Sequence, residues 1–310
     1  MRKFTLAGGL AAAMILAFSV QAAPVHKAAL TPQDHYADNA GVKIHYMAEG
    51  KGPLVVMIHG FPDYWATWKP LMATLSAAGY RVAAMDTRGY NLSDKPQGVA
   101  AYAMPNLIGD VGAVIKAEGQ TNAIVVGHDW GAAIAWQTVL NRPDLVNKLI
   151  IMAVPHPAGM ARELATNKDQ QANSQYARNF QKEGSEKLLT AERLASMSNK
   201  NPAEAAGYLE AFKRSDFAAM MNYYRANYPR ITAETPPPAA PVTYPQIKVP
   251  VLVIHGMKDT ALNAAGHAGT WNYVAADTTI LMIPTAGHFV QHDAEALVDR
   301  TVKDWLDARR

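Results

Sequence analysis

Short apolar runs alternate with longer segments of helical periodicity along most of the chain after Gly41. Seven runs are expected to be strands: Val42–Glu49, Leu54–His59, Arg81–Asp86, Ile124–Gly127, Leu149–Val154, Val251–His255 and Thr279–Ile283. Four segments are expected to be helices: Trp68–Ala78, Pro105–Ala117, Gly131–Leu140 and Ala294–Ala308. Short buried strands that alternate with helices predict an α/β fold, in which helices cover both faces of a mostly parallel sheet.

One long stretch interrupts this alternation. Between residues 155 and 244 no strand-like run occurs, and the stretch carries helical patterns rich in Ala, Lys, Glu and Tyr. It closes on the proline-rich segment Thr235–Pro241, which is typical of a stiff, extended linker. Because apolar runs resume near Val249, we expect a helical cap at 155–244, inserted into a core made of 23–154 and 245–310. A separate interaction domain is the alternative.

The N-terminus has the composition of a secretory signal. Arg2 and Lys3 precede an apolar stretch from Leu6 to Val20, and small residues occupy the positions three and one before a cleavage site after Ala22. We therefore expect residues 1–22 to be removed and the protein to be exported, to the periplasm or the medium. An uncleaved anchor is the weaker alternative, because about 18 or more continuous apolar residues are needed to span a bilayer.

Composition and charge limit the partners, nucleophiles and metal sites that this chain can have. The 310 residues carry a net charge of +3, and two of these charges lie in the expected signal, so neither nucleic acid nor an acidic membrane is indicated as a partner. The chain contains no cysteine, which excludes a thiol nucleophile and a thiolate metal site. No spacing of His, Asp or Glu is typical of a metal site.

The sequence Gly-His-Asp-Trp-Gly at 127–131 joins an expected strand to an expected helix. A nucleophile elbow has this form: a sharp strand-to-helix turn that presents the central side chain and requires small residues two positions before and after it. The central residue is Asp129, whose carboxylate needs no base to attack and forms an ester. Such attack suits the sp³ carbon of an epoxide or alkyl halide. A simple turn, or Asp129 as a helix N-cap, is the alternative interpretation.

Further residues complete a hydrolase site. His-Gly-Phe-Pro at 59–62 follows a strong strand, where this type of fold supplies an oxyanion donor, so the backbone N–H groups of Phe61 and Trp130 are the expected pair. Asp259 and His288 each follow a late strand, at the edge of the sheet where ligands bind. The order nucleophile, acid, histidine is that of α/β-hydrolases. His288 is then the base, oriented by Asp259, while His59 and His128 flank the site and shape it.

Taken together, these segments resemble the epoxide hydrolases of the α/β-hydrolase fold over nearly all of the mature chain. The resemblance rests on His59–Pro62, Tyr80–Pro96, Gly127–Gly131, Asp259 and His288.

The resemblance implies two cap tyrosines that hold and protonate the epoxide oxygen. Tyr224 matches the second, since Asn-Tyr-Tyr-Arg at 222–225 is similar to the family's Asn-Trp-Tyr-Arg, and Tyr176 best matches the first. Helical spacing also places Tyr224 on one apolar face with Phe217 and Met221, and Tyr223 elsewhere. We expect His59, Trp130 and Met221 to contact substrate.

The leading hypothesis is therefore an epoxide hydrolase that forms a vicinal diol through an Asp129 ester, without a cofactor or metal. Its partner would be a small hydrophobic epoxide, with the protein a monomer or homodimer. A haloalkane or haloacid dehalogenase would use the same nucleophile. Membership of the haloalkane dehalogenases would imply a halide-binding Asn where this chain has Phe61. Membership of the haloacid dehalogenases would imply arginines in the neighbourhood of Trp130 and Ala132. A non-catalytic binding protein on the same fold is a third possibility.

Overall fold

A computed structural model describes residues 31–198, 201–230 and 243–310. The expected signal (1–22) and the linker Thr235–Pro241 lie outside these residues. In the described part of the chain, no helix combines the length and the apolar composition needed to cross a lipid bilayer.

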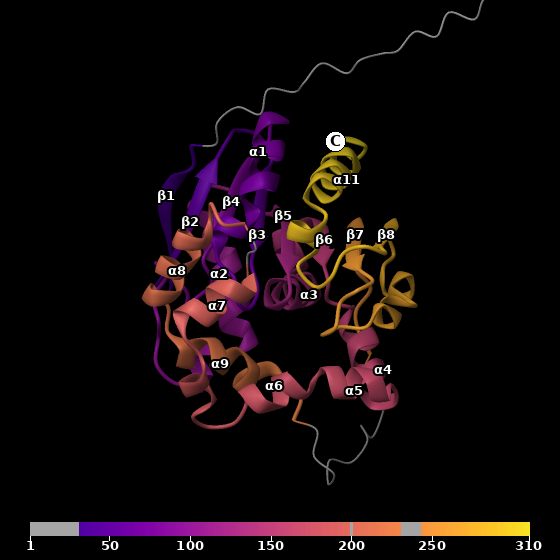
Figure 1. Cartoon of the computed structure of the whole chain (residues 1–310). Helices are drawn as coiled ribbons and strands as arrows, with labels where there is room; N and C mark the ends of the chain where they lie inside the picture. The colour runs from indigo at the N-terminus through magenta and orange to yellow at the C-terminus, as the bar shows by residue number, and fades with distance from the viewer. Residues whose placement is uncertain (1–30, 199–200, 231–242) are drawn as a thin grey trace, which may run out of the picture.

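The described residues contain one eight-stranded sheet with the order β1-β2-β4-β3-β5-β6-β7-β8 (Figure 1). Its strands are β1 (Gln33–Asn39), β2 (Val42–Glu49), β3 (Leu54–Ile58), β4 (Arg81–Met85), β5 (Ala123–His128), β6 (Val146–Met152), β7 (Val251–Gly256) and β8 (Thr278–Ile283). β2 pairs antiparallel with β1 and β4, and the remaining neighbours are parallel. The α/β-hydrolase fold expected from the sequence is confirmed.

The edge strand β1 was not predicted. Its sequence, Gln-Asp-His-Tyr-Ala-Asp-Asn, is polar, and Ala37 is its one fully buried residue. An edge strand with one solvated face needs no apolar run, because its main-chain bonds to β2 hold it in place.

Two layers of helices cover the sheet (Figure 1). Strand β3 illustrates the arrangement, because Val56 packs with the cluster that includes α2 (Met104–Ala117) and α3 (Trp130–Asn141). Its neighbour Val55 packs on the opposite face, with α1 (Lys69–Ala77) and α11 (Glu295–Asp307). Alternate strand residues point to opposite faces, so the all-apolar strand is buried from both sides.

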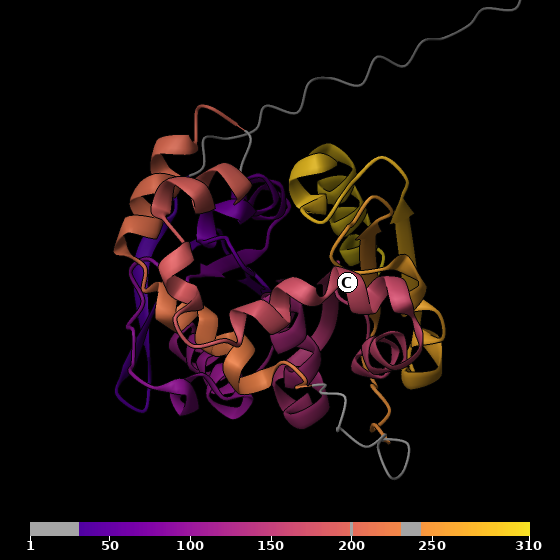
Figure 2. The ribbon, with the colours of Figure 1, turned by 60° about the horizontal axis from the view of Figure 1, so that its bottom comes forward.

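Among the described residues, six α-helices lie between β6 and β7, where the sequence predicted a cap, and we call them the cap helices. They are α4 (Pro157–Thr166), α5 (Lys168–Asn173), α6 (Gln175–Phe180), α7 (Ala191–Ser198), α8 (Ala205–Arg214) and α9 (Phe217–Asn227). In Figure 1, α4, α5 and α6 lie along the bottom of the view, and Figure 2 turns this side forward. Asp216 is the N-cap of α9, and its Oδ1 accepts hydrogen bonds from the N–H groups of Ala218 and Ala219.

Candidate active site

Asp129 occupies the sharp turn between β5 and α3. Its backbone has φ 51° and ψ −121°, a conformation that residues other than glycine rarely adopt. A Cβ on Gly127 would lie 2.3 Å from the carbonyl oxygen of Gly131, and a Cβ on Gly131 would lie 2.0 Å from that of Ile58. Both glycines are therefore required by close backbone approach, as the sequence predicted. Asp129 occupies the N-cap position of α3, but its carboxylate makes no capping bond to the helix.

The Asp129 carboxylate lies beside His288, which in turn contacts Asp259. The distance from His288 Nε2 to Asp129 Oδ2 is 3.3 Å, and from His288 Nδ1 to Asp259 Oδ2 it is 2.7 Å. Asp259 is fixed because its Oδ1 accepts hydrogen bonds from the N–H groups of Ala261 and Leu262. These three groups follow β5, β7 and β8, whose carboxyl ends meet at one edge of the sheet.

The two carboxylates set the charge of His288. Burial alone would lower the pKa of His288, but its hydrogen bonds to and ion pairs with Asp129 and Asp259 outweigh burial and raise that pKa to about 10. Burial likewise acts to raise the pKa of Asp129, yet the bond and charge of His288 and the Phe61 N–H lower it overall. At neutral pH the site therefore holds an imidazolium between two carboxylates, with Asp129 ionised.

One of the two expected oxyanion donors already contacts the nucleophile. The N–H of Phe61 donates to Asp129 Oδ1 at 2.7 Å. His59 sets the direction of this N–H, because its Nδ1 bonds the Gly60 carbonyl at 2.8 Å and its Nε2 accepts from the N–H of Thr87 at 3.0 Å. The Gly60 carbonyl and the Phe61 N–H belong to one planar peptide unit, so fixing the first aims the second.

His128 shapes the other side of the site, as expected. Burial lowers the pKa of His128 to about 4, so its ring is neutral at physiological pH. Its Nε2 lies 2.9 Å from the backbone carbonyl of His288, and its Nδ1 lies 3.3 Å from the side-chain amide of Gln291. His128 thus holds the main chain at His288.

A cavity of about 270 Å³ opens onto Asp129. Tyr176 of α6 and Tyr224 of α9 line it together with Trp130, as the sequence predicted. Their rings lie 6.2 Å apart, and the Trp130 ring lies edge-to-face on Tyr224 at 5.0 Å.

Both cavity tyrosines are protonated. Burial raises the pKa of Tyr176 and of Tyr224 well above the ordinary value of 10.0, and the nearby charge of Asp129 adds to this shift. Their hydroxyl groups can therefore donate. Tyr223 lies outside the cavity wall, and its hydroxyl donates to the carbonyl of Arg88, so the expectation that it points elsewhere is confirmed.

Two residues expected to contact substrate do not line this cavity. His59 is fully buried beneath the site, where it orients the Gly60 peptide, and Met221 is fully buried in the core. Met221 lies on the same helix as Tyr224, nearly one turn earlier. Tyr224 lines the cavity, whereas the Met221 side chain packs in the core.

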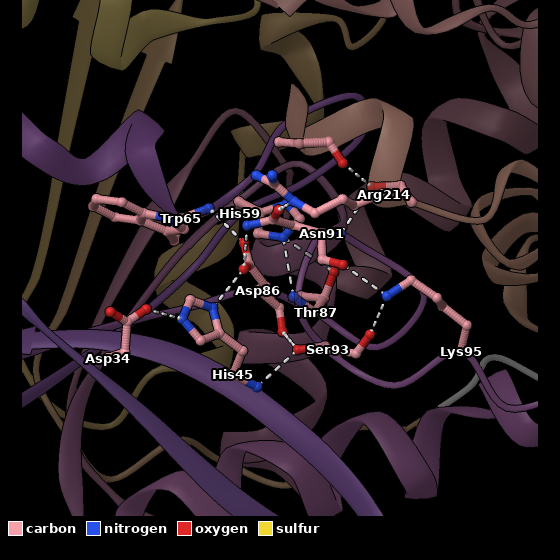
Figure 3. Close-up of polar contacts among 12 residues, drawn as sticks. Asp34, His45, His59, Trp65, Asp86, Thr87, Asn91, Ser93, Lys95 and Arg214 are labelled. Carbon is pink, nitrogen blue, oxygen red and sulfur yellow. Dashed lines mark hydrogen bonds and ion pairs between the residues drawn. The ribbon is translucent and has the colours of Figure 1, made fainter. Parts of the chain in front are cut away.

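The structure also contains a polar network that the sequence did not indicate as functional (Figure 3). The fully buried carboxylate of Asp86 accepts hydrogen bonds from Asn91 Nδ2 at 2.7 Å and the N–H of Trp65 at 3.1 Å, and pairs with His45 Nδ1 at 2.6 Å. Asn91 Oδ1 in turn accepts from Arg214 of α8 at 2.8 Å. The network ties the loop after Phe61 to β2 and to the cap.

Asn91 lies in the loop after β4. Its backbone lies in the left-handed region (φ 41°), which glycine adopts most readily. Its side chain also links the core to the cap, because it hydrogen-bonds both Asp86 and Arg214. Among the described residues, no group of three or more His, Asp or Glu side chains could hold a metal ion.

Known proteins resemble this chain over most of its length. A family model described as alpha/beta hydrolase fold matches residues 53–295. The chain is 34% identical to AB hydrolase superfamily protein YfhM of Bacillus subtilis (strain 168), covering 87% of this chain and 96% of that protein. It is 32% identical to Epoxide hydrolase 1 of Caenorhabditis elegans, covering 86% and 68%. The crystal structure of a mutant of an epoxide hydrolase from Bacillus megaterium superposes with a TM-score of 0.82 at 30% identity, covering 88% of this chain and all of that one.

Proposed function

The chain belongs to the epoxide hydrolases of the α/β-hydrolase fold, and from this membership we propose that it converts an epoxide to a vicinal diol through an ester of Asp129. The observation that carries the proposal is the placement of the Asp129 carboxylate. It opens onto a cavity lined by two protonated tyrosines on one side, and it contacts His288 on the other.

In the first half-reaction, Asp129 Oδ2 attacks one epoxide carbon. Oδ1 stays as the carbonyl oxygen, because the Phe61 N–H already holds it. The carbon–oxygen bond of the ring breaks, and the departing oxygen takes a proton from Tyr176 or Tyr224. General-acid help of this kind contributes about 10²–10⁴-fold in rate.

In the second half-reaction, His288 acts as the base. Esterification removes the negative charge of Asp129, which is one of the two groups that keep the histidine protonated. The pKa of His288 therefore falls when the ester forms, and the proton it releases restores the tyrosine. Neutral His288, oriented by Asp259, then takes a proton from the water that attacks the ester carbonyl.

The tetrahedral oxyanion that follows develops on Asp129 Oδ1. The Phe61 N–H lies in position to stabilise it, and the N–H of Trp130 is the proposed second donor. Collapse of this intermediate breaks the acyl–oxygen bond. The leaving alkoxide takes the remaining proton of the added water, so the diol leaves and both the Asp129 carboxylate and the His288 imidazolium are restored.

Heavy-oxygen labelling tests the proposal. In a single turnover in labelled water with excess enzyme, the first diol should carry only unlabelled oxygen, and the label should appear on the Asp129 peptide. This follows because the diol oxygen comes from the Asp129 carboxylate. Label in the first diol would show instead that water attacks the epoxide directly.

Dehalogenation is not favoured. Two protonated tyrosines that line the same cavity as Asp129 suit an alkoxide leaving group that needs a proton, whereas a halide needs none. Phe61 offers its backbone N–H but no side-chain amide for a halide. We further propose that the protein acts outside the cytoplasm, on the basis of the basic start and apolar stretch of residues 1–22.

A further inference from the structure

The cavity that reaches Asp129 follows one face of α3. Ala133, Trp136 and Gln137 line it, and they stand four, seven and eight positions after the nucleophile. Residues at this spacing share one side of a helix. At a rise of 1.5 Å per residue, Gln137 lies about 12 Å along the helix from Asp129.

The wall facing α3 is apolar. Helix α4 contributes Met160, Ala161 and Leu164 to it. Apart from Asp129, the polar groups of the described wall are the hydroxyls of four tyrosines, the indole N–H groups of Trp130 and Trp136, and the amides of Gln137 and Asn227. Most of the length of the cavity therefore suits a hydrocarbon substituent.

Two aromatic residues next to the site do not line this cavity. The Phe61 N–H contacts Asp129, and the Phe61 and Phe180 rings pack edge-to-face at 5.3 Å. Both rings also pack against Tyr224, at 5.9 and 5.1 Å. A second cavity of about 570 Å³, in the described part of the chain, touches His288 but is lined by neither Asp129 nor the two tyrosines. One substituent of an epoxide held at Asp129 thus has room, and a second on the other ring carbon meets aromatic rings.

We infer that the preferred substrates are terminal epoxides with one long apolar substituent, an inference that rests on the proposed epoxide hydrolysis. The ring sits between Asp129 and the tyrosines with its oxygen toward the hydroxyl groups. The substituent runs along α3 past Ala133 toward Gln137. The unsubstituted ring carbon faces the Phe61 and Phe180 rings.

Two isomeric probes test this directly on the wild-type protein. One is decane with a terminal epoxide, and the other is decane with the epoxide at the middle of the chain, so the two have equal hydrocarbon content. We expect kcat/KM for the terminal isomer to exceed that of the internal isomer by about 10² or more. Along a series of short terminal epoxides, kcat/KM should rise about fourfold per added methylene until the cavity is filled.

Equal kcat/KM for the two isomers, or no dependence on chain length, would overturn the inference while leaving epoxide hydrolysis intact. Failure of every epoxide to give diol or an Asp129 adduct would instead reject the proposed function.

A variant shortens the cavity. Ala133→Leu places a larger side chain about one turn from the nucleophile, and it should lower the ratio of long-chain to short-chain kcat/KM at least tenfold. Ala165→Leu is the matched control, because Ala165 is exposed on α4 and does not line the cavity. It should leave the ratio unchanged. An unchanged ratio in folded Ala133→Leu would contradict the proposed path, and if that variant does not fold, the isomer comparison still decides.

Discussion

Replacing Gly60 with alanine is expected to disable the nucleophile without changing any reacting atom. An ideal Cβ at this position would lie 2.4 Å from Asp129 Cβ, 2.5 Å from Asp129 Oδ1 and 2.7 Å from the carbonyl oxygen of His128. Each distance is shorter than real Cβ atoms show, so part of the site must move. Asp129 cannot retreat easily, because its backbone occupies the strained turn and its Oδ2 faces His288.

The peptide between Gly60 and Phe61 must therefore shift. That peptide carries the N–H that bonds Asp129 Oδ1 at 2.7 Å. Loss of one oxyanion donor costs about 10²–10³ in rate, and we expect kcat of Gly60→Ala to fall by this amount. Forcing an extra carbon into a packed site should also lower the free energy of unfolding by about 1–3 kcal/mol.

Urea unfolding and a diol-release assay measure the two effects on the same preparation. Gly112→Ala in α2 is the matched control, since a Cβ there meets only the end of the Leu145 side chain, at 3.3 Å. The control should keep the wild-type rate, and the helix can gain up to about 1 kcal/mol in stability. A folded Gly60→Ala protein with wild-type kcat would refute the close approach from which this prediction is drawn.

Three further predictions concern the tyrosines, the charge of the site and the N-terminus. Tyr176→Phe and Tyr224→Phe should each slow alkylation of Asp129 by about 10²-fold, and the double variant should nearly abolish it; a wild-type single-turnover rate in Tyr224→Phe would mean that this residue only packs. Because the folded protein raises the pKa of His288 from 6.5 to about 10, its contribution to stability is fully present below about pH 6.5 and is lost as pH rises through about 10. The free energy of unfolding, measured with urea across this pH range, should fall in the wild type but not in His288→Gln. Parallel pH profiles of the two proteins would contradict this prediction. Exported protein should begin at or near Ala23, and an intact mass that retains Met1 would reject the signal.

The core of the fold and the reacting groups were predictable from the sequence for a common physical reason. Buried parallel strands need continuous apolar runs, and the elbow needs glycines where a Cβ would strike backbone. Asp129, His288 and Asp259 each follow such a strand, so the parallel topology alone brings them to one edge. The distances of 3.3 and 2.7 Å between them agree with that reasoning.

Features that depend on tertiary packing were not predictable in the same way. Strand β1 has no apolar run, since it is held by main-chain bonds at an exposed edge. The role of His59 depends on Thr87 and Gly60 meeting its two ring nitrogens, which spacing does not reveal. Asp86 gathers partners from three separate segments, and only the folded chain brings them together.

Part of the cavity wall could have been predicted from the spacing of residues along the helix that follows Asp129. The sequence predicted a helix over Gly131–Leu140, directly after the nucleophile. Positions four, seven and eight after Asp129 on that helix share its face, and they are Ala133, Trp136 and Gln137. The facing residues of α4 could not be assigned this way, because the orientation of the cap is set by tertiary contacts.

The covalent intermediate on Asp129 is the central claim, and the His288→Gln protein tests it most directly. This variant keeps the nucleophile, the tyrosines and the Phe61 N–H but lacks the base for the second half-reaction. Mixed with a reactive terminal epoxide, it should gain one full substrate mass on a peptide that contains Asp129, whereas a haloalkane adduct would have lost its halide. Asp129→Ser should gain nothing. If His288→Gln is folded and binds substrate but never acquires the adduct, Asp129 is not the nucleophile that this account makes it.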